Sequence, residues 1–509
     1  MAQLEIRNLK FKYPNNNKLI LNNLSLVLKR GEFVVLTGST GSGKTTLLKM
    51  IKKELAPFGE TSGEILYDDK NLQEKTNKEL LKEIGYVFQN PNSQIITEYV
   101  WSELAFGLEN LGISTTQIQR RVGEIAQFFG INNWFDKKTI NLSGGEKQKL
   151  SLAAIIAMEP SLLLLDEPTA QLDPLAREEF FMILKKINEE LGITILLVEQ
   201  NLEEVFSFAS RVLVLKNGKI VVDDHPKAAI NSFPEELIDA LPTPALFYRK
   251  TNGIGEVPLT VREGRDYLFN TFKNEKKKLD LPLIQDKETI ISLKDLWFRY
   301  TKQGKDILSG LYLDIKKGEI LSVLGGNGSG KTTLLKVIAQ IYKPYRGKIK
   351  NKSNKTKIAM LPQDPEDLFL GPTILDDLRV LENRVDNYFL KAEIWIEKLA
   401  AYSLLNRNFY DLSGGEKQKV GLLKVLLTTD DIILLDEPSK GLDSQQKNDL
   451  IKILKEIKDS GISIIIVSHD IEFTALVSDR CALLFSGLIW FHQIRYFITA
   501  ILWYNVIRN

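Results

Sequence analysis

Two glycine-rich segments of this chain have the residue types that hold the phosphates of a nucleotide. Both follow the pattern G-x-x-x-x-G-K-T after a short apolar run, and both lead into a leucine pair that begins a helical pattern. Glycines let backbone N–H groups turn toward phosphate oxygens, and the N-terminus of the following helix adds a favourable dipole. We therefore expect nucleotide contacts from Gly38, Ser39, Thr40, Gly41, Ser42, Gly43, Lys44, Thr45 and Thr46, and from Gly325, Gly326, Asn327, Gly328, Ser329, Gly330, Lys331, Thr332 and Thr333.

The last side chains of each glycine-rich segment have distinct expected roles. Lys44 and Lys331 would reach the β- and γ-phosphates, and Thr45 and Thr332 would hold magnesium. A single segment of this kind is also compatible with a plain turn between a strand and a helix, with a solvated lysine. Two copies, each followed later by an apolar run that ends in Asp-Glu, favour the phosphate site.

Those Asp-Glu pairs stand at the ends of apolar runs that read as strands. Asp166 and Asp436 are then placed to coordinate magnesium through its shell, and Glu167 and Glu437 to polarise an attacking water. Asp-Glu pairs at strand ends more often cap a following helix. The two phosphate loops favour the catalytic interpretation here.

These motifs belong to an internal repeat. The eight residues 142–149 recur letter for letter as 412–419, and the separation of 23 positions from Ser143 to Asp166 recurs from Ser413 to Asp436. Repeats of this kind mark duplicated structural units. The repeat predicts a first domain at 1–235, a second domain at 288–491 and an atypical aromatic tail at 492–509. Between the domains, 236–287 is expected to be a linker with several prolines and room for a little structure of its own.

Within each half, short runs of β-branched residues and leucine alternate with longer segments of helical spacing. This alternation predicts an α/β fold with a largely parallel sheet. The expected buried strands include Phe33–Leu36, Leu162–Leu165, Ile193–Val198 and Ile320–Leu324, and the expected helices include Arg177–Glu190 and Gln446–Lys458.

Composition excludes several other classes of protein. With 509 residues, of which 44% are apolar and 26% charged, the chain is neither fibrous nor broadly disordered. The net charge of +2 gives no overall attraction to nucleic acid or anionic lipid. Cys481 is the single cysteine, which excludes an internal disulfide and a thiolate metal cluster. We expect no secretory signal and no spanning helix, because polar residues interrupt the aromatic tail.

The repeated Leu-Ser-Gly-Gly-Glu segment resembles the signature of the ATP-binding cassette (ABC) family. Taken alone, Ser143 and Ser413 would simply cap helices. The resemblance implies an ATPase with two P-loop NTPase domains, each a mainly parallel core sheet with an antiparallel β part and a helical subdomain. It also implies two ATP molecules with Mg²⁺ between the domains. Ser413, Gly414 and Gly415 would then complete the site of Lys44, and Ser143, Gly144 and Gly145 the site of Lys331.

Further positions match the family pattern. Tyr13 and Tyr300 precede the glycine loops where the family stacks an aromatic ring on adenine, although isolated tyrosines are more often strand residues. Gln89 and Gln363 match the glutamine that links the metal to a membrane partner. Asp173 and Asp443 match the loop that couples the two sites.

One position departs from the pattern. Val467-Ser468-His469-Asp470 carries the expected histidine that contacts the γ-phosphate, whereas the matching stretch of the first half is Val198-Glu199-Gln200-Asn201. Gln200 can donate a hydrogen bond to phosphate but cannot become a cation. We therefore expect unequal sites, with faster turnover at the site of His469.

Two cassettes without spanning helices resemble the energy-coupling-factor (ECF) importers, most clearly in residues 87–94, 103–110 and 167–174. That resemblance implies separate transmembrane T and S subunits, uptake of a vitamin or transition metal, and a peripheral position on the cytoplasmic face of the membrane. The alternative is a soluble ABC-type ATPase acting on the ribosome. Such proteins usually carry a long, charged helical linker, which this chain lacks, and the charge balance gives no footprint for nucleic acid. A DNA-repair cassette would need a long coiled coil, and no sustained heptad run is present.

For an importer, the segments 90–141 and 364–411 should form small helical subdomains. The resemblance implies that each receives a helix of the membrane subunit in a groove beside its glutamine. Ile95, Ile96 and Trp101 are candidates to line the first groove, and ordinary core positions are an equally good interpretation of them. Selectivity for the transported molecule would lie in the membrane subunits.

Overall fold

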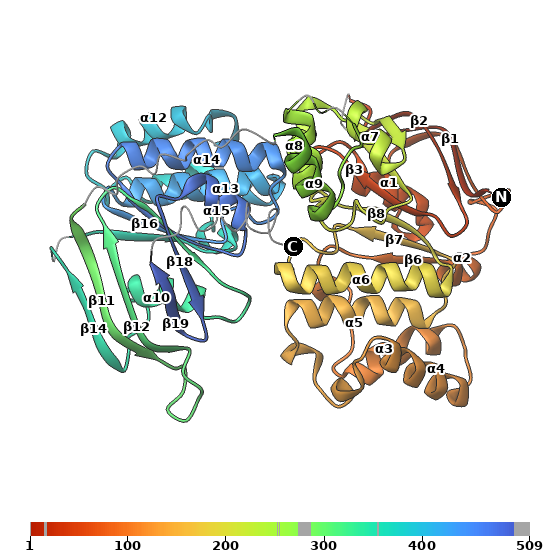
Figure 1. The fold of residues 1–509 in the computed structure, drawn as a ribbon, viewed down its shortest axis with the longest axis horizontal. Helices are drawn as coiled ribbons and strands as arrows, with labels where there is room; N and C mark the ends of the chain where they lie inside the picture. Colours follow the sequence, from red (N-terminus) through yellow and green to blue (C-terminus); the bar gives the residue numbers. More distant parts are fainter. Residues whose placement is uncertain are drawn as a thin grey trace. The chain divides into compact units, whose positions relative to one another are not determined.

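The computed structural model describes residues 2–14, 18–251, 253, 255–272, 287–353 and 356–492. The chain divides into two compact units, Met1–Lys273 and Asn274–Asn509. Figure 1 labels the helices and strands of each unit. Within the described residues, no helix has both the length and the apolar character needed to cross a membrane.

The core of the first unit is a six-stranded sheet in the order β10-β9-β3-β8-β7-β6. Neighbouring strands are parallel except for β10, which runs antiparallel to β9. Strands β3, β7 and β8 are buried along their whole length, as expected for leucine- and valine-rich runs covered on both faces. The strands are β3 Phe33–Thr37, β6 Ile84–Val87, β7 Leu162–Asp166, β8 Thr194–Val198, β9 Arg211–Lys216 and β10 Lys219–Asp224.

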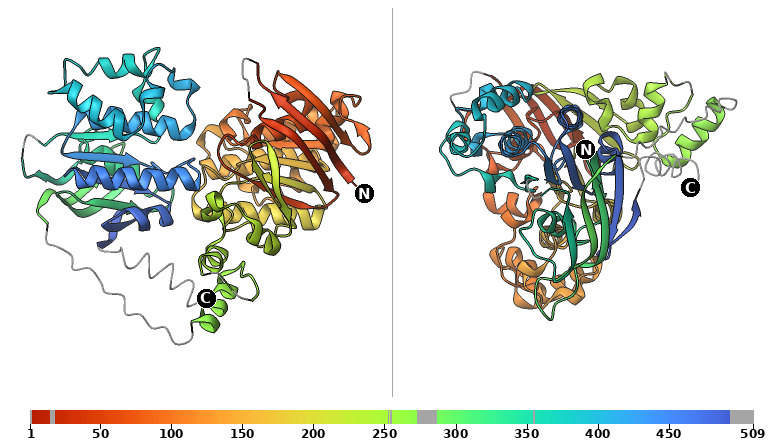
Figure 2. Two further views of the ribbon diagram at one scale, coloured as in Figure 1. Left: turned by 90° about the horizontal axis from the view of Figure 1, so that it is seen from above. Right: turned by 90° about the vertical axis from the view of Figure 1, so that its left-hand side faces the viewer.

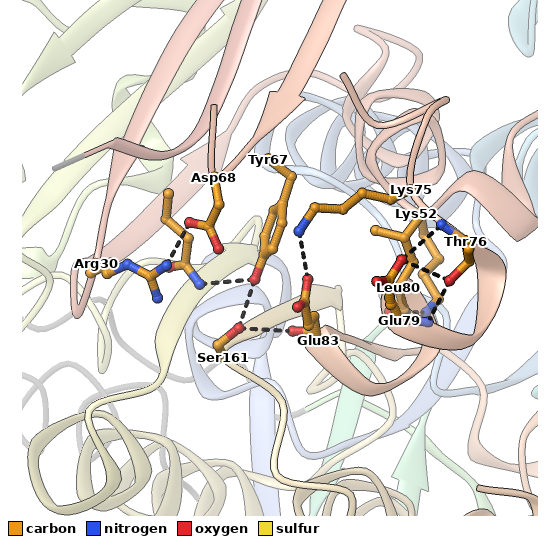
Figure 3. Close-up of polar contacts among 11 residues, drawn as sticks. Arg30, Lys52, Tyr67, Asp68, Lys75, Thr76, Glu79, Leu80, Glu83 and Ser161 are labelled. Carbon is orange, nitrogen blue, oxygen red and sulfur yellow. Dashed lines mark hydrogen bonds and ion pairs between the residues drawn. The ribbon is translucent and has the colours of Figure 1, made fainter. Parts of the chain in front are cut away.

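A second, antiparallel sheet in the order β2-β1-β4-β5 packs on the same unit. Its strands are β1 Ala2–Lys12, β2 Leu21–Lys29, β4 Glu60–Tyr67 and β5 Lys70–Asn71. Figure 3 shows the polar contacts that join it to the core: the hydroxyl of Tyr67, at the end of β4, lies 2.6 Å from that of Ser161, just before β7. The ammonium of Lys75 donates to Glu83 at 2.9 Å beside this pair.

Helices cover the core sheet and build a separate subdomain. Helix α1 follows β3 after the glycine loop, and α5 lies between α6 and the α3–α4 pair (Figure 1). Helices α3 and α4 fall inside segment 90–141, where a helical subdomain is predicted. The helices are α1 Lys44–Ile51, α2 Asn77–Glu83, α3 Val100–Asn110, α4 Thr115–Phe128, α5 Gly144–Ala157 and α6 Pro174–Leu191.

The chain continues past β10 as a run of short helices that belongs to the first unit, and the left view of Figure 2 shows these helices in green. They are α7 Pro226–Ser232, the 3-10 helix Glu235–Ala240, α8 Thr243–Lys250 and α9 Val261–Thr271. Leu237, Leu241, Ala245, Tyr248 and Tyr267 are buried members of the first unit's apolar core. Much of the expected linker is therefore folded onto the first cassette. Its lysine run, 276–278, lies outside the described residues.

The second unit repeats this architecture. Its core sheet has the order β15-β16-β17-β13-β18-β19, and the strands of its antiparallel sheet are ordered β12-β11-β14. Read from the other end, the core order matches that of the first unit strand by strand. The strands are β11 Thr289–Phe298, β12 Leu308–Lys316, β13 Ile320–Leu324, β14 Arg346–Asn351, β15 Ile358–Leu361, β16 Ile432–Asp436, β17 Ser463–Ser468, β18 Arg480–Phe485 and β19 Leu488–His492.

Helices of the second unit occupy the matching places. They are α10 Lys331–Ile338, α11 Ile374–Arg379, α12 Tyr388–Lys398, α13 Gly414–Thr428, α14 Ser444–Asp459 and α15 Ile471–Val477. The expected helices and buried strands are confirmed to within a few residues at their ends, and the α/β class is confirmed in both units. Beyond His492, the aromatic tail lies outside the described residues.

Candidate active sites

Each glycine loop leaves the central strand of its sheet and opens directly into a helix. At Gly38, with φ of +155°, a Cβ would lie 2.2 Å from the carbonyl oxygen of Leu215, so only glycine fits there. Lys44 begins α1 and donates to the carbonyl oxygens of Gly38 at 2.7 Å and Ser39 at 3.1 Å. Lys331 begins α10 and makes the same pair of bonds in the second loop, at 2.8 and 3.1 Å. Both ammonium groups therefore lie inside their loops, where a phosphate can compete for them.

Three buried polar atoms at these loops have no hydrogen-bond partner within the part of the chain that the structure describes. They are Ser42 Oγ, Ser329 Oγ and Asp436 Oδ1. Buried polar groups in folded proteins are nearly always paired. The two serines stand at matching positions of the two loops, and the aspartate is an expected metal ligand. These unpaired oxygen atoms fit a bound phosphate and its magnesium ion, whose preferred ligands are oxygens.

The expected metal ligands of the first site come together from distant parts of the chain. The Thr45 hydroxyl donates to Asp166 Oδ1 at 3.0 Å, and the Tyr86 hydroxyl donates to Asp166 Oδ2 at 3.2 Å. Burial raises the pKa of Asp166, and these two hydrogen bonds oppose the rise. In the second site burial likewise raises the pKa of Asp436, opposed by the Thr332 hydroxyl. A metal cation would favour the ionised form of both aspartates.

The carboxylate of Glu167 lies between two amide side chains. Gln200 Nε2 donates to its Oε1 at 2.6 Å, and Gln89 Nε2 donates to its Oε2 at 3.3 Å. Glu167 has φ of +44°, in the left-handed region that non-glycine residues rarely adopt. Such backbone conformations cluster at functional sites. The structure thus places Gln89, Glu167 and Gln200 together.

The matching carboxylate of the second site lies between a histidine and a lysine. Glu437 Oε2 is 2.9 Å from His469 Nδ1, and Glu437 Oε1 is 3.4 Å from the Lys331 ammonium. Burial would raise the pKa of Glu437, but His469 and then Lys331 together hold it below its ordinary value. Its φ of +51° repeats the strained backbone of Glu167. Gln363, the counterpart of Gln89, is exposed.

Glu199 is a residue that sequence reasoning did not select. It follows β8 directly, is only 4% exposed, and accepts a hydrogen bond from the Thr169 hydroxyl at 3.0 Å. Burial, and then the charge of Glu167, raises the pKa of Glu199 to about 8. Its counterpart in the second unit is Ser468. The sequence feature that could have identified Glu199 is an acidic residue directly after an apolar strand.

The signature serines begin helices in the way the plain capping interpretation requires. Ser143 Oγ accepts from the Glu146 N–H at 3.3 Å, and Glu146 accepts from the Ser143 N–H at 2.8 Å. Ser413 and Glu416 form the same reciprocal pair. Both serines and the glycines that follow them, Gly144 and Gly414, are exposed, and Gly145 and Gly415 are half-buried. The role of these residues opposite a nucleotide remains a prediction.

Tyr13 and Tyr300 are hydrogen-bonded to the helices that follow their glycine loops. The hydroxyl of Tyr13 lies 3.1 Å from that of Thr46, and the hydroxyl of Tyr300 lies 2.8 Å from that of Thr333. Tyr300 is 60% exposed, and its ring packs in T-shaped contacts with Phe298 and Tyr342. Asp173 and Asp443 cap helices α6 and α14.

Comparisons with known proteins agree with this geometry. A family model described as "ABC transporter" matches residues 21–170 and 308–440. A protein of Bacillus thuringiensis subsp. konkukian, named as an ABC transporter ATP-binding protein, is 39% identical over 503 residues, which cover 96% of this chain and 91% of that protein. CbiO1 from Clostridium perfringens, described as part of the ABC transporter complex CbiONQ, is 31% identical over 47% of this chain and 93% of its own, with a TM-score of 0.43.

The archaeal ribosome recycling factor aABCE1, solved in complex with ribosomal stalk protein aP1, is 21% identical. The match covers 98% of this chain and 92% of that one, with a TM-score of 0.62, and it shows a shared two-cassette fold. Members of the matched family are ATPases that bind ATP with Mg²⁺, and the paired loops and carboxylates of both units fit that chemistry. The chain therefore belongs to the ABC transporter family of ATP-binding, ATP-hydrolysing proteins.

Proposed function

We propose that the chain is the energy-coupling ATPase of an ECF-like importer for a vitamin or a transition metal. It acts from the cytoplasmic face of the membrane and drives separate T and S transmembrane subunits. The proposal is supported by two sets of cassette motifs on one chain, which differ at Gln200 and His469. It is also supported by relatives that are named as ABC transporter ATP-binding proteins and match nearly the whole chain.

In the proposed cycle two ATP molecules lie between the cassettes. Ser413, Gly414 and Gly415 complete the site of Lys44, and the first-half signature completes the site of Lys331. N–H groups at the start of the signature helix bind a γ-phosphate, which ADP lacks, so ATP closes the pair and hydrolysis releases it. Glu167 and Glu437 polarise the attacking water. Thr45 and Asp166, or their counterparts, would hold Mg²⁺, which would supply positive charge to neutralise the phosphates.

One observation carries the transporter assignment: each helical subdomain displays a large apolar side chain shortly after its glutamine. Ile96 follows Gln89 and is 70% exposed, and Leu370 follows Gln363 and is 94% exposed. Ile95 packs against the core and Trp101 is 47% exposed, so the three candidates for the first groove divide between core and surface. A single exposed apolar side chain is common on protein surfaces, so the support comes from its recurrence at the matching loop of both cassettes.

The exposed loops are held by buried carboxylates. Glu103 accepts from the N–H groups of Ile96 and Thr97 at 3.1 and 2.8 Å. In the second unit Asp377 accepts from the N–H groups of Leu370 and Gly371 at 3.1 and 2.9 Å. Both acids are 6% exposed. The same arrangement, built from different residues, keeps an apolar side chain exposed in each cassette, which suits a rigid docking point for a membrane subunit.

The test is copurification of the tagged full chain from detergent-solubilised membranes. We expect a polytopic membrane protein to copurify with the wild type and to be lost from the Ile96→Glu, Leu370→Glu double variant, while ATPase activity of the purified chain is retained. Phe58→Glu is the matched control, because Phe58 is 88% exposed and lies outside the helical subdomains. Equal recovery from both variants would contradict the docking role.

The second candidate function, a soluble ATPase acting on the ribosome, has the shared fold of aABCE1 in its favour. A similarity of 21% identity supports the fold and not the role. The net charge of +2 gives no overall attraction to ribosomal RNA. Recovery of ribosomal proteins in place of a membrane protein in the same experiment would replace the importer proposal with this one.

A further inference from the structure

The residues that follow β8 connect the first active site to the C-terminal helices of the first unit. Gln200 donates to Glu167 at 2.6 Å, and the next residue, Asn201, accepts from the Glu203 N–H at 2.9 Å through its side chain. From Glu203 to Phe208 the chain makes turns and no regular helix. The position of Gln200 therefore depends on what holds this irregular segment in place.

Residues 235–271, here called the anchoring segment, form hydrogen bonds with Leu202 and Glu203, while Arg177 of α6 lies 3.8 Å from Glu204 farther along. The Leu202 N–H donates to the Ala240 carbonyl oxygen at 3.3 Å. Glu203 Oε2 accepts from the Thr243 N–H at 2.7 Å and from the Thr243 hydroxyl at 3.1 Å. Thr243 is the first residue of α8, so the Glu203 carboxylate lies at a helix N-terminus, where negative charge is stabilised.

Packing supports the same connection. Leu202, Val205 and Phe206 are fully buried, and they share one apolar core with Leu241 and Ala245 of the anchoring segment. The contact is thus a buried interface with a charged hydrogen bond at its edge. Moving the anchoring segment would move the chain two or three residues from Gln200.

The second unit supports the matching residues by another route. After His469, Asp470 caps helix α15 by accepting from the Phe473 N–H at 3.0 Å. The Lys447 ammonium of α14 donates to the same carboxylate at 2.6 Å. Asn201 replaces that aspartate in the first unit. In the described part of the second unit, the support for His469 therefore comes from the cassette's own helices.

We infer that the anchoring segment is a positioning element of the first active site, and that Glu203 is the positioning residue through which it holds Gln200 against Glu167. The inference rests on the role of Glu167 proposed above. It does not depend on the membrane partner, because its test needs only the purified chain. A binding partner that displaced the segment would slow the first site and leave the second unchanged.

The test measures each site separately in the full-length chain. Glu437→Gln confines hydrolysis to the first site, and Glu167→Gln confines it to the second. In the Glu437→Gln background, Glu203→Ala should lower kcat about tenfold with KM for ATP changed by less than about twofold, because displaced catalytic groups reduce the rate of the chemical step more than ground-state binding. In the Glu167→Gln background the same change should leave kcat within about twofold.

Two further variants distinguish positioning from general destabilisation. Glu203→Gln retains an oxygen acceptor for Thr243 and should restore most of the first-site rate. Lys250→Ala breaks an exposed ion pair with Asp239 inside the same segment and should change neither rate. Equal losses at both sites on Glu203→Ala would mean a structural role and overturn the inference. An unchanged first-site kcat, or a first site without measurable turnover in the Glu437→Gln background, would overturn it as well.

Discussion

Replacing Glu199 by glutamine should change how the stability of the first unit depends on pH. The side chain is buried beside Glu167, and its pKa is raised from the ordinary 4.5 to about 8. Between these values the folded chain retains a proton that the unfolded chain has lost. The free energy of unfolding therefore falls as pH rises, by up to about 1.4 kcal/mol per unit. The contribution of the Glu199 proton to the free energy of unfolding is fully present below pH 4.5 and is lost by pH 8.

Glutamine keeps an acceptor for the Thr169 hydroxyl and cannot titrate. Relative to the wild type, Glu199→Gln should therefore gain about 3 kcal/mol of unfolding free energy between pH 5 and pH 7.5, from the same linkage. The neighbouring charge of Glu167 contributes to the raised pKa, so the measurement belongs in buffer without nucleotide or Mg²⁺.

Amide hydrogen exchange of the buried strands β7 and β8 reports opening of the first unit alone. The ratio of variant to wild-type exchange at each pH removes the intrinsic pH dependence of the chemistry. Glu189→Gln, on an exposed position of α6, is the matched control. A stability difference between Glu199→Gln and wild type that stays constant from pH 5 to 7.5 would refute the assignment of a buried, proton-retaining carboxyl.

Three further predictions concern hydrolysis. Glu437→Gln should lower total ATPase activity more than Glu167→Gln, because only the second site pairs its carboxylate with a histidine; near-normal activity of Glu437→Gln together with loss in Glu167→Gln would reverse this ranking. Adding Gln200→His to Glu437→Gln should raise first-site kcat about tenfold, since an imidazolium can stabilise transition-state charge, and an unchanged rate would argue against that cause. Lys44→Ala and Lys331→Ala together should abolish hydrolysis in a phosphate-release assay, and retained activity would exclude both glycine loops as the catalytic nucleotide sites.

Local patterns determined the phosphate loops and the fold class. A glycine loop followed by a helix needs only a few consecutive residues, and the structure has such a loop at Gly38 and a helix that begins at Lys44. The order of short apolar strands and amphipathic helices likewise predicted the parallel sheet, because β3, β7 and β8 are leucine- and valine-rich along their whole length. Because the motifs recur in the same order, each structural prediction for one half of the chain applied to the other half as well.

Contacts between residues far apart in the chain were decided by the tertiary structure. Hydrogen bonds from Gln200 to Glu167 and from Thr243 to Glu203 join segments that no local pattern connects. The burial of Glu199 likewise depends on residues distant in the chain. Prolines between the two repeats suggested a linker, yet its apolar residues Leu241 and Tyr248 are buried in the first unit's core. The free energy of burying those side chains depends on the surface they meet, and that surface exists only after the first cassette has folded.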